Sequence, residues 1–389
     1  MYNTKNNGSI RQRSNGTYEY RIYVDKKPKS FYGKTIAEVQ RKCREFFKEY
    51  KEVQINNEEI KDIILDKFIE YWLKTYKYGT IADSTYDRLE NIYAKHIKNS
   101  FIAKKDITEV TTDNVQILIN SKKQTLSISS LKKIKEVLYP CFQFAKNQNL
   151  VEKNPIEGVI IPKIVSEYDD RDTKFYSDEA IVLIANTVSA RYYQINPRRY
   201  RYAPLFTFIL NTGLRIGECM ALQWSDVNYE NKTLKVNKSV TTYYERDNNI
   251  DKITRKQHIG NTKTLKGNRV LPLNDSAIYC LKIMEERNKD IGINSNLIFC
   301  NYEGNLLNIK SVQTTFKKIC SDIGVEHKGL HALRHTFGSI LIKKHIDIKV
   351  VSELLGHTDV RFTYNRYIHI IQEQKAEAMN MINITPSYV

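Results

Sequence analysis

The sequence has little of what marks membrane, secreted or metal-bound proteins. No run approaches the ~20 consecutive apolar residues that a membrane-spanning helix needs, and residues 1–13 lack the apolar segment of a secretory signal. The 6 cysteines lie far apart with no C-x-x-C pair, so neither a disulfide framework nor a zinc site has the required spacing. We therefore expect a soluble, cytoplasmic protein with reduced, mostly buried thiols and no membrane partner.

Sequence signatures of nucleotide and metal chemistry are also absent. The chain contains no G-x-x-x-x-G-K-[ST] loop, no H-E-x-x-H and no acidic cluster that could hold paired metal ions. Nucleotide hydrolysis and metal-assisted cleavage therefore lack their usual machinery. We expect no metal and no other cofactor.

The charge of the chain is strongly positive. Lys and Arg total 61 against 44 Asp and Glu, which gives a formal net charge of +17 and a pI near 9.3. This balance favours a polyanionic partner, with nucleic acid as the first candidate. Many lysine-rich proteins have no such partner, so the organisation of the chain must decide.

The chain is too long for one ordinary domain, because single cores seldom grow past ~250 to 300 residues. Residues 9–33 alternate apolar and polar side chains and predict short strands, with turns at Asn15-Gly16 and over Asp25 to Pro28. A helix follows, with Thr35 as N-cap and Glu38 completing a capping box. The first 50 residues hold 12 Lys and Arg against 5 acids. A basic three-stranded sheet of this kind could lie in a DNA groove.

A helical bundle is predicted between residue 60 and about residue 147. Apolar residues recur there at spacings of three and four, and polar residues that favour helix starts stand at Asp83, Thr112 and Ser129. The first helix carries an apolar stripe of Ile64, Phe68, Tyr71 and Trp72. Prolines 155 and 162 and the acidic stretch 167–172 then mark a domain boundary before one large C-terminal domain.

Four short motifs follow one another in that C-terminal part. They are NTGLRIGECMALQWSDV at 211–227, NTKTLKGNRVLPL at 261–273, HALRH at 331–335 and LLGHTDVRFTYNRYIH at 354–369. No single motif is specific, but in this order they resemble the catalytic domain of the tyrosine recombinase, or phage integrase, family over roughly residues 175 to 375.

The resemblance implies a multidomain fold that is mainly α with small β parts. An arm-site DNA-binding domain would span residues 1–54 and contain the three-stranded sheet and its helix. A helical core-site DNA-binding domain would span 60–162, and a mixed α+β catalytic domain with a C-terminal tail helix would span 173–389. The basic N-terminal unit is similar to that of integrases from conjugative transposons and phages.

The motif residues suit attack on a phosphodiester. Its non-bridging oxygens are negative, and the transition state gathers more charge on them, which planar guanidinium groups can bind. By motif position Arg215 and Arg334 would form this clamp, and His331 would donate a hydrogen bond or carry a proton. Lys263 would protonate the leaving 5′ oxygen.

Two points of this assignment leave alternatives or further roles. Lys266 competes with Lys263 as the general acid. His357 would hold the scissile phosphate or the nucleophile by a hydrogen bond. Glu218, Leu222, Trp224 and Asp226 also match the family motif and are interpreted as packing and turn residues.

Tyr367 is the predicted nucleophile, since it lies ten residues after His357, the spacing found in the family. A free phenol has a pKa near ~10 and needs neighbouring cations to react at neutral pH. Its product, a 3′-phosphotyrosine, would retain the energy of the broken bond, so rejoining would need no ATP. Tyr364 is the nearest competitor but points about 60° away on a helix.

The motif departs from the family at one place, where Phe362-Thr363 replaces a frequent Thr-Thr pair. We expect this change to alter how the tyrosine segment packs and to leave cleavage intact. Beyond Tyr367, the residues Ile370, Ile371, Ala378 and Ile382 predict an amphipathic terminal helix. In the family such tails dock on a neighbouring protomer; packing on its own domain is the alternative.

The predicted function is site-specific DNA recombination that mobilises a phage or a conjugative transposon. The resemblance implies double-stranded DNA with core and arm sites as partner, and a homo-tetramer on synapsed DNA that exchanges strands through a Holliday junction. An accessory excision factor is compatible with this pattern. The alternatives are a cleavage-deficient DNA-binding regulator with the same fold, and an enzyme like a type IB topoisomerase.

Overall fold

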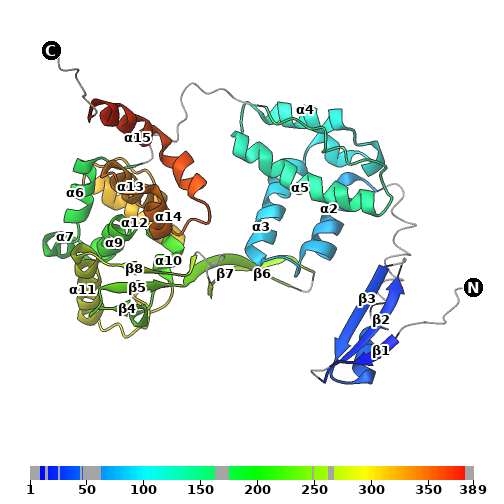
Figure 1. Ribbon diagram of the computed structural model, residues 1–389, viewed down its shortest axis with the longest axis horizontal. Helices are drawn as coiled ribbons and strands as arrows, with labels where there is room; N and C mark the ends of the chain where they lie inside the picture. Colours follow the sequence, from blue (N-terminus) through cyan, green and yellow to red (C-terminus); the bar gives the residue numbers. More distant parts are fainter. Residues whose placement is uncertain are drawn as a thin grey trace, which may run out of the picture. The chain divides into compact units, whose positions relative to one another are not determined.

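The computed structural model describes residues 9–13, 16–24, 27–43, 46, 63–162, 175–247, 249–261 and 267–381 (Figure 1). The chain forms two compact units, Met1–Ile164 and Val165–Val389. Three predicted features lie outside the described residues: the acidic boundary at 167–172, the end of the helix that follows the N-terminal sheet, and Ile382. None of the described helices is long and apolar enough to cross a membrane.

The first unit begins with the predicted antiparallel sheet, in the order β1 (Ser9–Gln12), β2 (Tyr18–Val24) and β3 (Lys27–Gly33). Residues 36–43 are helical, and the Thr35 hydroxyl accepts a hydrogen bond from the Glu38 amide at 3.2 Å, as an N-cap should. The Glu38 carboxylate accepts a hydrogen bond from the backbone amide of Lys34 and not from that of Thr35, so the predicted capping box is not complete. Pro28 is part of β3, opposite Tyr23, so the predicted turn is shorter than expected.

One face of this sheet is organised around a single buried carboxylate. Glu19 is 0% exposed and accepts hydrogen bonds from Arg11 Nε at 2.8 Å and Arg13 Nε at 3.2 Å, while Arg21 Nη2 lies 3.5 Å away. Ser30 and Tyr32 donate to its other oxygen. These partners hold the pKa of Glu19 down at about 2, the Arg11 hydrogen bond having the largest effect. The guanidinium groups remain largely exposed.

The rest of the first unit is the predicted helical bundle. Its helices are α2 (Leu65–Trp72), α3 (Asp83–Ile92), α4 (Thr112–Lys122) and α5 (Ile128–Asn147), with π-helical turns at Leu73–Lys77 and Tyr93–Ile97 and 3-10 turns at Phe101–Lys104 and Ile107–Glu109. The starts predicted at Asp83 and Thr112 are confirmed. The start predicted at Ser129 is wrong by one residue, because Ser127 caps the helix through the Ser130 amide. The stripe on α2 also shifts, since Ile64 is 39% exposed and Leu65 and Ile69 are buried instead.

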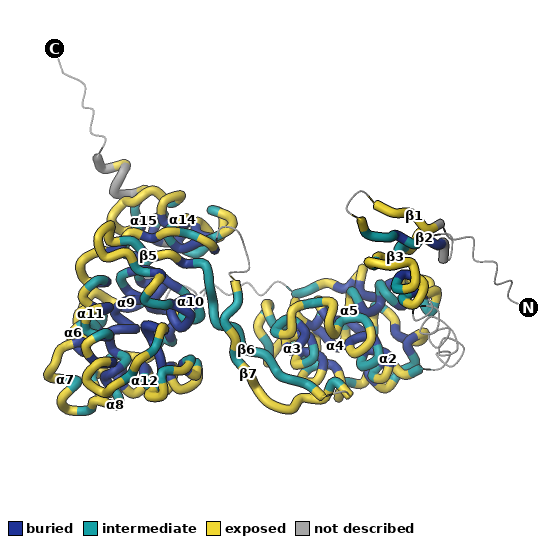
Figure 2. The backbone as a smooth tube through the Cα atoms, turned by 90° about the horizontal axis from the view of Figure 1, so that it is seen from below, coloured by how far each residue is buried: buried dark blue, intermediate teal, exposed yellow. Residues whose placement is uncertain are grey.

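The second unit packs helices around the apolar helix α9 (Ala203–Thr212), of which only Asn211 is not buried. Figure 2 shows α9 as a dark core element. It contacts α6 (Asp178–Asn186), α11 (Asp275–Asp290) and α13 (Leu330–Lys343). The remaining helices are α7 (Ala190–Ile195), α8 (Pro197–Tyr200), α10 (Ile216–Met220), α12 (Ile309–Asp322), α14 (Ile348–Leu355) and α15 (Val360–Met381), with a 3-10 turn at Trp224–Asp226.

Two small antiparallel sheets complete the second unit. One has the order β4 (Val227–Asn228), β5 (Thr233–Val236) and β8 (Arg269–Pro272). The other is a hairpin of β6 (Lys238–Arg246) and β7 (Lys252–Asn261), inserted between β5 and β8 and without a fully buried residue (Figure 2).

Two glycines end the helices that lead into the predicted site residues. Gly213 follows α9 with φ +65°, and Gly356 follows α14 with φ +64°. A side chain at either position would be strained in this left-handed conformation, and at Gly213 a Cβ would also lie 2.4 Å from the Phe337 ring. The chain can therefore turn sharply and present Arg215 and His357 just beyond the helix ends.

Candidate active site

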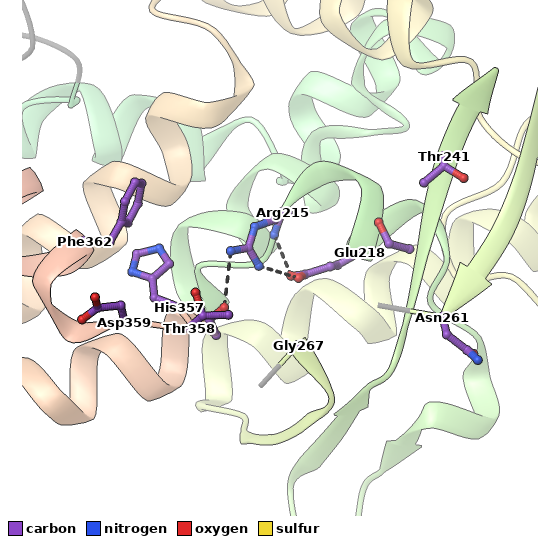
Figure 3. A pocket seen from close by; sticks show the side chains of 11 residues that line it. Arg215, Glu218, Thr241, Asn261, Gly267, His357, Thr358, Asp359 and Phe362 are labelled. Atoms are coloured by element: carbon purple, nitrogen blue, oxygen red, sulfur yellow. Dashed lines mark hydrogen bonds and ion pairs between the residues drawn. The ribbon is translucent and has the colours of Figure 1, made fainter. Parts of the chain in front are cut away.

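Three of the four C-terminal motifs line one cavity of about 660 Å³ in the second unit, and HALRH contributes no residue to its wall (Figure 3). Arg215 and Glu218 line it from one side, and Gly356, His357 and Phe362 line it from another. The hairpin β6–β7, with Ser239, Thr241 and Asn261, and Gly267, just before β8, also line the cavity. The first and last motifs, about 140 residues apart in the chain, thus share one site.

Arg215 is the cation among the described residues of the cavity wall. It precedes α10, and its side chain is 40% exposed. Nη1 donates to Glu218 Oε1 at 2.9 Å, and Nη2 approaches the Gly356 carbonyl at 3.4 Å. The Glu218 carboxylate also accepts the Arg215 backbone amide at 3.0 Å, so both ends of the residue are fixed. A planar guanidinium held in this way can bind an anionic oxygen in the cavity.

Arg334, on α13, is buried behind the cavity. It donates to the Gly213 carbonyl at 2.7 Å and to the Leu355 carbonyl at 2.6 Å, which joins the C-terminal ends of α9 and α14. Burial, and secondly the charge of Arg215, lower its pKa to about 9. The group remains a cation at neutral pH, but in surroundings that hold an excess of positive charge.

The two predicted histidines are neutral bases in this cluster. Desolvation, followed by the charges of Arg334 and Arg215, lowers the pKa of His357 to about 3. The pKa of His331 is lowered to about 4, first by desolvation and then by Arg334. The Nδ1 atom of His357 lies 2.7 Å from the Thr363 hydroxyl, which leaves Nε2 as the nitrogen available to a ligand. Phe362 holds the same ring edge-on at 4.9 Å between centroids.

Tyr367, the predicted nucleophile, is buried and is not part of the cavity wall. It is 2% exposed in an apolar cluster with Ile342, Val351, Leu355 and Ile370. Its hydroxyl has no hydrogen-bond partner among the described residues. Burial raises the pKa of the phenol to about 12, against the opposing effects of Arg334 and Arg366. In this position the phenol is poorly suited to lose its proton.

A notch in α13 receives the Tyr367 ring. A Cβ at Gly338 would overlap the phenol oxygen of Tyr367, so only glycine leaves the space. One turn before Gly338 on α13, His335 Nε2 lies 2.6 Å from Nη2 of Arg366, which is on α15. Because an arginine can only donate, His335 accepts with Nε2. At Tyr367 itself α15 departs from helical geometry, with φ −116° and ψ 17°.

The predicted site is thus assembled in part. Arg215, Arg334, His331 and His357 belong to one electrostatic cluster, and Tyr367 packs beside it. Lys263 and Lys266 lie outside the described residues. Tyr364 is 39% exposed and forms no part of the cavity wall.

Sequence reasoning missed Arg269 and understated Glu218, which do more than form a turn. Arg269 Nη2 donates to Glu218 Oε2 at 3.1 Å, and this ion pair is nearly buried. The residue opens the strand RVLP, and nothing in its neighbourhood in the sequence names a partner 51 positions away.

Comparisons with known proteins show the family of the chain. A family model described as Phage integrase family matches residues 175–374, just over half of the chain, and a model described as Phage integrase, N-terminal SAM-like domain, matches residues 64–136. The chain belongs to the phage integrase family. The predicted class is confirmed: the protein is a tyrosine recombinase, an enzyme of site-specific DNA recombination.

Similar proteins match along most of their length. A tyrosine recombinase XerC-like protein of Caldanaerobacter subterraneus subsp. tengcongensis is 29% identical over 371 residues, which covers 91% of each chain. The prophage ps2 probable integrase of Lactococcus lactis subsp. lactis is 24% identical and covers 96% of this chain and 99% of its own length.

Solved structures share the fold. The Tn1549 transposon integrase in complex with a circular intermediate DNA has a TM-score of 0.62 at 19% identity, over 82% of this chain and 100% of that one. A lambda integrase tetramer bound to a Holliday junction has a TM-score of 0.57 at 16% identity, over 92% and 97%. The predicted fold class, mainly helical with small sheets, is confirmed.

The notch at Gly338 predicts an unusual response to Gly338→Ala. In an open helix this change should stabilise by about 1 kcal/mol. Here the methyl group meets the Tyr367 oxygen, so we expect overpacking to destabilise the second unit by about 1–3 kcal/mol. Urea unfolding measures the difference. Ser339→Ala, which removes a buried hydroxyl that has no hydrogen-bond partner among the described residues, is the control and should not destabilise. A Gly338→Ala variant more stable than the parent would contradict the close contact between Gly338 and Tyr367.

The contact between His335 and Arg366 predicts a dependence of stability on pH. Burial, and then the neighbouring cations, lower the pKa of His335 from its usual 6.5 to about 3. The unfolded chain therefore binds this proton first, and stability that is present above pH 6.5 is lost as the pH falls towards 3. His335→Gln keeps an acceptor for Arg366 and does not titrate.

Urea unfolding at pH 7.5 and pH 5 tests this dependence in both proteins. Between these values, stability of the parent should fall by roughly 2 kcal/mol more than that of His335→Gln. Equal losses in the two proteins would show that His335 is free to take up a proton in the folded state.

Proposed function

We propose that the protein cuts DNA at specific sites through a covalent 3′-phosphotyrosine link at Tyr367 and then rejoins it. The observation that carries this proposal is the cationic cavity formed by Arg215 and His357, backed by Arg334 and adjoining the helix on which Tyr367 packs. The phenol oxygen attacks the scissile phosphorus, the bond to the 5′ oxygen breaks, and Lys263, or Lys266 in its place, supplies a proton to that oxygen.

The remaining residues act on the phosphate and on the phenol proton. Arg215 and Arg334 bind the non-bridging oxygens, whose charge grows in the transition state. His357 donates from Nε2, since its Nδ1 is engaged by Thr363. His331 carries the phenol proton or donates a hydrogen bond; an anionic phosphate beside it favours the protonated ring, whose pKa is lowered to about 4 without one. The ester keeps the energy of the broken bond, so attack by a 5′ hydroxyl reverses the step.

Three domains divide this work in our proposal. Residues 1–54 bind arm sites, 60–162 bind the core site, and 173–389 carry out the chemistry. Separate apolar cores support the first division: Ile22 and Val39 are buried in the sheet and its helix, and Phe68 in the bundle. The match of residues 64–136 to a SAM-like domain of phage integrases supports a core-site role. The exposed arginines around Glu19 support the arm-site role.

Recombination requires two DNA sites, and we propose four protomers that exchange strands through a Holliday junction. The similar lambda integrase forms a tetramer on such a junction, and the similar Tn1549 integrase acts for a transposon. By this analogy the chain integrates and excises a phage or a conjugative transposon in the cytoplasm, with an accessory factor directing excision.

Tyr367→Phe tests the proposed nucleophile. Labelled, nicked duplexes made from the DNA that flanks the chain's own gene should trap a protease-sensitive adduct on a denaturing gel, because the released 5′ fragment escapes and cannot religate. We expect the adduct to disappear completely in Tyr367→Phe and to persist in the control Tyr364→Phe. An adduct that survives in Tyr367→Phe would exclude this nucleophile, and site-specific binding without any adduct would indicate a cleavage-deficient regulator.

The arginines around Glu19 predict the salt dependence of DNA binding. Changing Arg11, Arg13 and Arg21 together to Gln should lower the slope of log K against log salt by about 2 to 3, since each lost phosphate contact contributes ~0.9. The full chain is titrated with a duplex of random sequence. Lys42→Gln is the control, because Lys42 pairs with Glu38 and the Tyr32 carbonyl. An unchanged slope in the triple variant would show that these three arginines do not contact DNA phosphates.

A further inference from the structure

Arg269 joins three segments that carry site residues, although it does not line the cavity. Its side chain is 9% exposed. Nη2 and Nη1 lie 3.1 and 3.4 Å from the two oxygens of Glu218, Nε donates to the Leu354 carbonyl at 3.0 Å, and Nη1 also reaches the Gly267 carbonyl at 3.2 Å. The group therefore contacts the motif of Arg215, the turn before His357, and the segment before β8.

Glu218 contacts both Arg269 and Arg215. The carboxylate is 3% exposed and lies between the two guanidinium groups, with contacts of 2.9 and 3.0 Å to Arg215 and 3.1 Å to Arg269. Burial alone would raise its pKa, but the charge of Arg269, followed by that of Arg215, holds the pKa below its usual value. Without Arg269 the carboxylate would be buried against a single, partly exposed cation.

The turn before His357 is held by three arginines. The consecutive carbonyls of Leu354, Leu355 and Gly356, at the C-terminal end of α14, accept from Arg269, Arg334 and Arg215 respectively. The end of a helix carries partial negative charge, which favours cations there. A Cβ at Gly356 would lie only 2.8 Å from Arg269 Nη1, so the fit between turn and guanidinium is close.

We infer that Arg269 is a positioning residue for DNA cleavage, which sets Arg215 through Glu218 and His357 through the Leu354 carbonyl. The inference rests on the proposed roles of Arg215 and His357. It requires the planar fork of arginine, which can contact a carboxylate and a carbonyl at once. A lysine ammonium is a single point charge on a flexible stem and cannot hold both.

Arg269→Lys in the full chain tests the inference, with the nicked duplexes described above under single-turnover conditions. Displacement of site groups by as little as 1 Å costs on the order of 100-fold in rate. We therefore expect the rate constant of adduct formation to fall by about 10-fold to 100-fold, while the affinity for the duplex and the final fraction of protein in adduct stay at parental values.

Arg287→Lys is the matched control, since it removes an equally buried guanidinium from α11. Arg287 donates to the carbonyls of Val188, Tyr200 and Arg201, outside the site. A loss of packing alone should reduce the fraction of active protein and leave the rate constant of the remainder unchanged. Arg269→Lys behaving in this way, or cleaving at the parental rate, would overturn the inference.

A double-mutant comparison separates positioning from general stability. If Arg269 acts on Arg215 through Glu218, the rate loss in Arg269→Lys with Glu218→Gln should be smaller than the product of the two single losses; independent losses would contradict that link. If Arg269→Lys does not fold, Arg269→Gln with Glu218→Gln removes both buried charges together. That pair should fold and cleave slowly, and parental cleavage by it would overturn the inference. An adduct that survives in Tyr367→Phe would instead refute the proposed nucleophile.

Discussion

The site depends on the ion pairs that the buried carboxylate of Glu218 forms with Arg215 and Arg269. This carboxylate is the anion that lies between Arg215 and Arg269, and with the carbonyls at the end of α14 it holds cations that would otherwise repel one another. Burial is the main cause of the lowered pKa of Arg334, and the charge of Arg215 lowers it further. In the proposed mechanism these cations favour the incoming phosphate, and Arg215 is already fixed in the cavity wall.

Tyr367, in contrast to the cations, lies in apolar surroundings. Its seat on Gly338 is apolar, its hydroxyl lacks a hydrogen-bond partner among the described residues, and the pKa of the phenol is raised. In the proposed mechanism the phenol must leave this seat to meet the phosphate, and the contacts of Thr363 with His357 and of Arg366 with His335 would have to adjust. The cationic cluster and the nucleophile are therefore two separately held parts of one site.

Local sequence signals predicted what depends on local physics. The N-cap at Thr35 and the helix starts at Asp83 and Thr112 follow from hydrogen bonds within a few residues. The motif order also predicted the family. Three features could not be read from the sequence: the role of Arg269, the shift of the α2 stripe and the burial of Tyr367. Each depends on a partner distant in the chain, such as Glu218 or Gly338, and tertiary packing alone selects it.

The most direct test of the account is to identify the residue that carries the DNA. The trapped adduct from a nicked duplex is digested with trypsin and nuclease, and the modified peptide is sequenced by mass spectrometry. The account predicts a phosphoryl-nucleotide on Tyr367, within the peptide that follows Arg366. A modification on Tyr364 or on any other residue would contradict it.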